Sequence, residues 1–216
     1  MSNSTSAIPF ILNMVQEKLA SIVLPFYLIL GIVNNTFCII YFLQRGQRAS
    51  SCAFYLLLAA ITNMFAVIFG FTTNMLNTWI PLASTLMIYC KSRQYINHTL
   101  ILIGRMFTVL ASIDTYAITS SKQAFRMFSR QSIAIKCPLV VGFCCPLIAV
   151  HIAIMNTIVA GQCVMTGVYS IIFTIYQMLI AGIIPPLAMI IFSGLAYWNM
   201  KKIGVRHDEI LHRTKQ

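Results

Sequence analysis

Charged residues are scarce in this sequence, and acidic residues are the scarcest. Only 9% of the 216 residues are charged, with four Asp and Glu against fifteen Lys and Arg. A soluble domain carries about 25% charged residues, whereas 59% of this chain is hydrophobic. This composition excludes an ordinary soluble protein and predicts a chain embedded in a lipid bilayer.

Sequence motifs of several functional classes are absent as well. The N-terminus has neither the basic region nor the cleavage site of a signal peptide. The basic residues show no RNP-type or zinc-finger pattern, so we interpret them as loop charge at lipid headgroups rather than as a nucleic-acid surface. We find no metal-ligand spacing of Cys and His and no catalytic cluster, and we therefore expect no metal, no cofactor and no enzyme.

Long apolar stretches make up most of the chain. Each approaches or exceeds the roughly 20 residues that a helix needs to cross hydrocarbon. We expect an all-α, polytopic membrane helix bundle over residues 19–200, between an extracellular segment 1–18 and a cytoplasmic tail 201–216. The expected spans are residues 19–43, 52–76, 87–120, 133–155 and 168–200.

The basic residues favour one orientation of these spans. Most of them lie in the loops after the first and third spans and in the tail. The positive-inside rule places those segments in the cytoplasm and the N-terminus outside. The glycosylation sequon at Asn3 agrees, because it has value only outside the cell. We therefore expect a multi-pass protein of the plasma membrane.

Two of the seven cysteines fall on the outer side in this topology. Cys90 begins the third span, and Cys163 lies in the loop between the fourth and fifth spans. Thiols on the cytoplasmic side stay reduced, whereas two cysteines in an oxidising compartment should pair. We expect a disulfide that pins this loop over the mouth of the bundle. The alternative is two unrelated buried thiols.

The third span contains two polar features that are energetically unfavourable in lipid. Arg105 lies within it, and Asp114-Thr115-Tyr116 lies near its cytoplasmic end. Arg105 precedes Asp114 by nine residues, about 13 Å along a helix, which is too far for pairing. We expect Arg105 to face the bundle and to contact carbonyls or amides of the fourth and fifth spans. We expect Asp114 to bind a base in the loop Lys122–Arg130, to become neutral because burial disfavours its charged form, or only to cap an interface.

Several of these residues, taken in order, resemble those of rhodopsin-like (class A) G-protein-coupled receptors, especially divergent invertebrate neuropeptide receptors. The matching residues are Asn35, Asn63, Trp79, Cys90 with Cys163, Asp114-Thr115-Tyr116 at the place of Asp-Arg-Tyr, and the helix-five proline Pro185 or Pro186. The resemblance covers nearly the whole chain. It implies five of that family's seven helices, an extracellular ligand and a heterotrimeric G protein as partner.

The chain also departs from that family. Thr115 replaces the arginine that reaches the G protein, and Asn63 replaces the acid of a sodium site. No tryptophan marks the middle of the fourth span, and the sequence ends at Gln216, before the family's sixth and seventh helices. We therefore expect a receptor fragment with weak or absent coupling.

The resemblance also indicates a ligand pocket at the outer end of the third span. Gln94, Asn97 and His98 project there, and Asn97 stands where amine receptors carry an Asp. An ammonium ligand would have no carboxylate partner, which favours a peptide over a biogenic amine. His98 is equally explained as a hydrogen-bonded interface residue, which is the interpretation we prefer.

The alternative function is a small polytopic transporter or channel subunit. Such a protein is expected to show repeated halves or several intramembrane acids. The sequence shows no internal repeat, and Asp114 is the only acid in the predicted spans.

Overall fold

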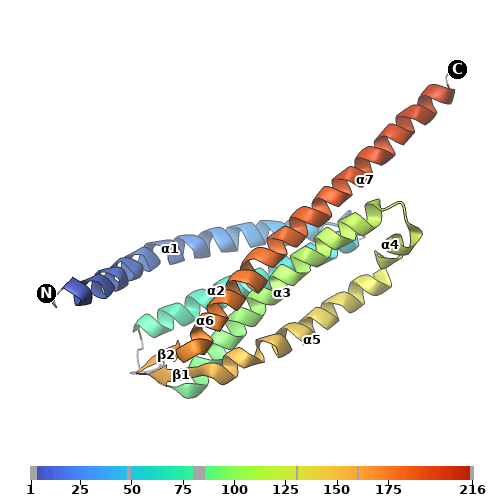
Figure 1. Cartoon of the computed structure of the whole chain (residues 1–216). Helices are drawn as coiled ribbons and strands as arrows, with labels where there is room; N and C mark the ends of the chain where they lie inside the picture. The colour runs from blue at the N-terminus through green and yellow to red at the C-terminus, as the bar shows by residue number, and fades with distance from the viewer. Residues whose placement is uncertain (1–3, 48–49, 80–85, 130, 160, 215–216) are drawn as a thin grey trace.

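A computed structural model describes residues 4–47, 50–79, 86–129, 131–159 and 161–214. Over these residues the chain is a bundle of long helices with one short hairpin (Figure 1), so the expected all-α membrane bundle is confirmed. The described residues include five segments long and apolar enough to cross a membrane. They are Ser21–Phe42, Ser51–Leu76, Met87–Thr119, Ile133–Met155 and Gly167–Gly204.

The elements follow one another with short connections. They are α1 (Ser4–Phe42), α2 (Ser51–Trp79), α3 (Met87–Thr119), α4 (Gln123–Phe128), α5 (Gln131–Met155), β1 (Asn156–Val159), β2 (Gln162–Met165), α6 (Gly167–Tyr176), the π-helical segment η2 (Gln177–Ile183) and α7 (Ile184–Thr214). The helix α4 and the hairpin occupy segments expected to be loops. The predicted tail continues α7 as far as Thr214.

The first helix is longer than its membrane span. It begins at Ser4, so most of the segment expected to precede the bundle continues the helix. No glycine lies between Ser4 and Gly31. Pro9 falls near the helix start, where proline interferes least, whereas Pro25 lies inside the helix. The apolar window of this helix begins only at Ser21.

The bundle has two ends that carry different elements (Figure 1). We call the end with β1, β2 and the start of α3 the hairpin end, and the opposite end the α4 end. The N-terminus lies toward the hairpin end and the C-terminus toward the α4 end (Figure 1). This arrangement follows from an odd number of crossings in the described chain.

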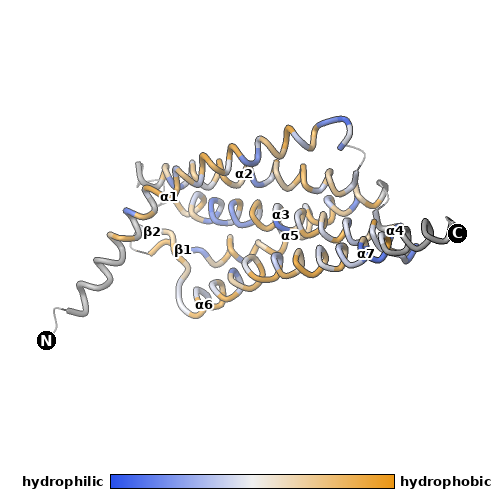
Figure 2. Tube along the Cα trace, turned by 90° about the horizontal axis from the view of Figure 1, so that it is seen from above, coloured by the Kyte–Doolittle hydropathy of each residue, from blue (hydrophilic) through white to orange (hydrophobic). Residues whose placement is uncertain are grey.

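The helix α3 lies at the centre of the bundle. It packs against α2, α5 and α7, whereas α1 packs mainly on α2. Its hydrophilic turns lie mostly in the half nearest the hairpin end, while α5 and α6 are largely hydrophobic (Figure 2). Large apolar side chains such as Phe37, Leu139 and Ile190 remain exposed on the outer helices. A surface of this kind requires lipid around it.

Two asparagine–glycine contacts join α2 to α3. A Cβ atom on Gly104 of α3 would collide with the side-chain oxygen of Asn63 on α2. A Cβ atom on Gly70 of α2 would lie 3.1 Å from the side-chain oxygen of Asn97 on α3. Both helices therefore carry the spacing Asn-x₆-Gly, and each asparagine packs where the facing helix has no side chain.

Candidate functional site

The hairpin end is closed by a disulfide, as predicted. Cys90 in the first turn of α3 is fully buried and bonded to Cys163 on β2, with 5.5 Å between their Cα atoms. Cys163 stands opposite Ile158 in the antiparallel hairpin. Gly161 in the turn has φ 76°, a conformation that glycine adopts without strain. The connection between α5 and α6 is thereby fixed to the end of α3.

An aromatic cluster lies next to this closed end. It comprises His98 of α3, His151 of α5, and Tyr169, Phe173 and Tyr176 of α6. The His98 Nε2 atom and the Tyr176 hydroxyl lie 3.1 Å apart, at hydrogen-bond distance. The His151 ring meets the edge of Tyr176 at 5.2 Å. The cluster joins three helices, and the buried Tyr169 hydroxyl has no partner among the described residues.

Two of the three residues expected to line one pocket, Asn97 and His98, contact different helices. His98 is buried against α6, whereas Asn97 is turned toward Gly70 of α2. Consecutive residues of an α-helix differ by about 100° in direction, because one turn takes 3.6 residues. Gln94 is half-buried one turn nearer the hairpin end. The hydrogen-bonded position of His98 agrees with an interface histidine.

The middle of the bundle contains Arg105 opposite an irregular stretch of helix. Arg105 lines a cavity of about 200 Å³ between α3 and the junction of η2 with α7. Pro185 and Pro186 lie in the first turn of α7 and line the same cavity. The Ile184 N–H group donates to the Leu179 carbonyl, which is the wide spacing of a π-helix. Proline lacks an N–H group, so the helix ladder is interrupted here.

The polar residues of the first two spans occupy different environments. The side-chain amide of Asn35 is buried and donates to the Gly31 carbonyl of its own helix at 2.7 Å. Asn63 instead faces α3 at Gly104. These positions make Asn63 part of the α2–α3 interface. The predicted glycosylation site Asn3 lies outside the described residues.

At the α4 end, Asp114 is fully buried and held by the start of α2. The hydroxyl of Ser51, the first residue of α2, donates to Asp114 Oδ2 at 2.9 Å. The sequence left open a base in the next loop, a neutral carboxyl group or an interface contact. Among the described residues, the hydrogen-bond partner of Asp114 is this hydroxyl. The positive end of a helix dipole also favours an acid here. Two serines directly before an apolar run were the available sequence signal for this helix start.

The same hydroxyl reaches the segment that follows α4. Ser51 Oγ lies 2.9 Å from Ser129 Oγ. A hydroxyl has one proton, so Ser51 donates to Asp114 and accepts from Ser129. The resulting chain Ser129–Ser51–Asp114 connects the end of α4 to α2 and α3.

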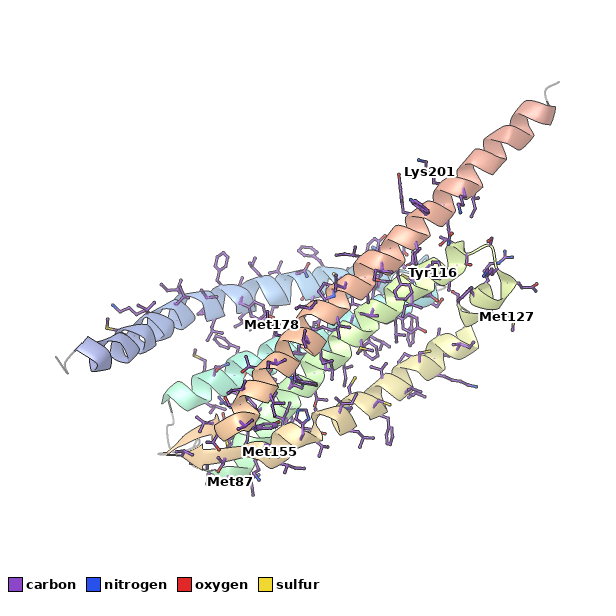
Figure 3. The ribbon with its side chains drawn as sticks, in the orientation of Figure 1. Met87, Tyr116, Met127, Met155, Met178 and Lys201 are labelled. Carbon is purple, nitrogen blue, oxygen red and sulfur yellow. A yellow bond between two sulfur atoms is a disulfide. The ribbon has the colours of Figure 1, made fainter. Side chains whose placement is uncertain are left out.

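The two residues after Asp114 point to different neighbours. Thr115 Oγ1 donates to the Ala111 carbonyl at 2.9 Å and lies 3.4 Å from Cys52 Sγ. Tyr116 is directed toward α7 (Figure 3), where its ring centroid lies 5.9 Å from that of Phe192. It also meets Phe125 of α4 at 5.7 Å. Tyr116 therefore joins three elements at the α4 end.

Comparison with known proteins adds no family to these observations: a scan against protein-family models and a search of curated proteins both find no match. The described chain is a multi-pass membrane-helix protein whose α5–α6 connection is bonded to its central helix.

Proposed function

We propose that this chain is a signal receptor of the rhodopsin-like kind, with the hairpin end outside the cell and the α4 end in the cytoplasm. The observation that carries this proposal is the disulfide between Cys90 and Cys163. It holds a hairpin over one end of a central helix whose other end carries Asp114-Thr115-Tyr116. This arrangement offers a fixed mouth for an extracellular ligand, with a peptide favoured, and a single rigid path to the opposite side.

Two contacts support signal transfer along that path. At the hairpin end, His98 of α3 meets Tyr176 of α6. At the α4 end, Tyr116 of α3 meets Phe192 of α7. A ligand that separates the first pair would move α6 against α3, and the run from α6 through η2 to α7 would carry that displacement toward the second pair. The G protein would meet the surface formed by α4 and the ends of α3 and α7.

Position 115 limits coupling in this proposal. Thr115 is occupied with its own helix and with Cys52, and it offers no positive charge to a partner. We expect the wild-type chain to couple weakly or not at all, and Thr115→Arg to raise coupling. The measurement is the ligand-independent dissociation of G-protein subunits in cells, which resonance energy transfer between the subunits reports.

The matched control is Thr119→Arg, one turn further along α3, where the hydroxyl also donates to carbonyl groups of its own helix. A gain with Thr115→Arg and none with Thr119→Arg, at equal surface expression, supports the receptor proposal. Equal signals from both variants and from the wild type contradict it.

A transporter or channel subunit remains the second candidate, because the chain has a broken helix at membrane depth. The η2 segment and Pro185-Pro186 interrupt the last span beside Arg105. Transporters place such interruptions at their substrate sites. Ion flux through proteoliposomes that contain the purified chain tests this candidate, and flux lost in Arg105→Gln would favour it over a receptor.

A further inference from the structure

Arg105 is a positive charge inside a membrane span that has no acid at its depth. The sequence contains four acids. Asp114 is nine residues away on the same helix, about 13 Å along the axis, and is bonded to Ser51. The other three lie outside the five apolar spans: Glu17, Asp208 and Glu209. An intramembrane arginine costs about 2.5–3.5 kcal/mol even on the mildest scale, so a partner is expected.

The cavity beside Arg105 presents one charged group among apolar walls. Its lining includes Arg105 and Thr108 from α3 and Ala181, Pro185, Pro186 and Met189 from η2 and α7. The Thr108 hydroxyl already donates to the Gly104 carbonyl at 3.0 Å. A volume of about 200 Å³ has room for a carboxylate and several carbons, because one water takes about 30 Å³.

One backbone carbonyl in this wall has lost its helical donor. The Ala181 carbonyl would accept from residue 185 in an α-helix and from residue 186 in a π-helix. Both residues are proline, which has no N–H group. Ala181 is 2% exposed, so water has little access to it. This carbonyl can accept from one edge of the guanidinium, but it does not neutralise the charge.

We propose that this cavity binds a carboxylate through the guanidinium of Arg105. A guanidinium presents five N–H donors in a planar fork, and a carboxylate accepts two of them side by side. The Ala181 carbonyl takes a donor from the remaining edge. The carbon chain of the ligand lies against Pro186 and Met189. Gly182 and Pro186 are exposed, so the cavity opens on the surface of the described bundle.

The carboxylate has two possible sources, an alkyl carboxylate dissolved in the bilayer or a small water-soluble anion. The experiment uses the full chain in nanodiscs of phosphatidylcholine, which adds no net headgroup charge. A photoreactive decanoate carrying a diazirine is the probe, and labelled positions are read by mass spectrometry. Decanoate, methyl decanoate and acetate are the competitors.

We expect saturable labelling of residues beside Arg105 that decanoate removes and methyl decanoate does not. Arg105→Gln should weaken probe binding by about tenfold or more, because a charge-assisted contact is lost. Met189→Phe should weaken it similarly by filling the cavity while keeping the arginine. The control Lys202→Gln removes a cation outside the cavity, 6.0 Å from the Trp198 ring centroid, and should leave labelling unchanged.

The competitors show which source the bound carboxylate has and whether its negative charge is needed for binding. Competition by acetate at concentrations similar to those of decanoate identifies a small soluble anion, and competition by decanoate alone identifies a carboxylate from the bilayer. Equal labelling of the wild type and Arg105→Gln, or equal competition by the methyl ester, overturns the proposal and leaves an apolar groove. Absence of saturable labelling overturns it in favour of a cavity that holds only water.

Discussion

Asn63 and Gly104 set the register of α2 against α3. The side-chain oxygen of Asn63 lies within the space that a Cβ atom on Gly104 would need. Asn97 and Gly70 make the reversed contact, seven residues later on α2 and seven residues earlier on α3, with more room between them. The first contact is tighter than the second, so alanine substitutions at the two glycines should lower the free energy of unfolding by different amounts.

Gly104→Ala should lower the free energy of unfolding by about 1–3 kcal/mol, because the added methyl group overpacks the interface. Gly70→Ala should cost less, since the neighbouring amide needs to move only a little. Adding Asn63→Ala to Gly104→Ala should recover part of the loss. Thermal unfolding of the chain in detergent micelles measures these differences.

The control for this series is Gly142→Ala on α5, where a Cβ atom meets nothing within 4 Å. That substitution should be neutral or slightly stabilising, because alanine favours the helix over glycine. A loss at Gly142 equal to that at Gly104 would mean that the asparagine contact is not the cause.

Loss of the Cys90–Cys163 bond should destabilise the chain by about 2–4 kcal/mol, because the bond closes a long loop. The two cysteines are 73 positions apart in the sequence. Cys90→Ser, Cys163→Ser and the double variant should lose similar amounts, since each breaks the same bond. Thermal unfolding under non-reducing conditions measures the loss.

The exposed free thiol of Cys144 provides the comparison. Cys144→Ser should unfold like the wild type. Because it keeps the Cys90–Cys163 bond, it should also change its electrophoretic mobility on reduction, as the wild type should. Additive losses in the double variant would show that the two cysteines act separately.

Ser51 and Asp114 should be energetically coupled. Ser51→Ala removes the donor to a buried carboxyl group, which costs about 1–3 kcal/mol. The same change in an Asp114→Ala background should cost little, because no carboxyl oxygen is left without its donor. A double-mutant cycle on unfolding free energies measures the coupling.

Ser112 supplies the matched cycle, because its hydroxyl donates to the Thr108 carbonyl of its own helix at 3.2 Å. Its coupling to Asp114 should be near zero. A coupling as large as that of Ser51 would rule out a specific Ser51–Asp114 bond as the origin.

The proposed orientation predicts glycosylation at Asn3 and not at Asn34. The helix α1 extends 17 residues from Ser4 to the start of the apolar window at Ser21, about 26 Å, so the sequon precedes a helix start that is well separated from the apolar window. Asn34 begins a second sequon, Asn34-Asn35-Thr36, but it lies within the span Ser21–Phe42. Glycosidase treatment should shift the mass of the wild type and not that of Asn3→Gln.

A sequon introduced between Lys122 and Arg126 tests the other side. It should stay unmodified when the α4 end is cytoplasmic. Modification there, with none at Asn3, would reverse the orientation.

The fold was largely predictable because lipid makes a strict demand on sequence. A span must be apolar over its whole length and must satisfy its own backbone, which leaves a helix as the solution. The disulfide followed from topology, since the expected crossings placed Cys90 and Cys163 on one side. The hairpin was missed because β1 and β2 have four residues each, too few for a pattern to separate from a loop.

The candidate site was predictable only in part. The depth of Arg105 and Asp114 follows from their place in the sequence, whereas their partners depend on how helices rotate against one another. Ser51 is 63 positions from Asp114, and no local pattern connects them. The π-helical turns also escaped prediction, because Pro185-Pro186 indicates a break but not the form that the preceding backbone takes.

The segment η2 has a consequence for how this chain tolerates changes in length. A π-helical stretch holds about one residue more per turn than an α-helix. Removing one residue between Gln177 and Ile183 would let the stretch tighten to α-helix while Tyr176 and Phe192 keep their directions toward α3. A deletion within α7 itself would rotate every later side chain of that helix by about 100°. The segment η2 is therefore a place where the last span can lose a residue without turning its inner face to lipid.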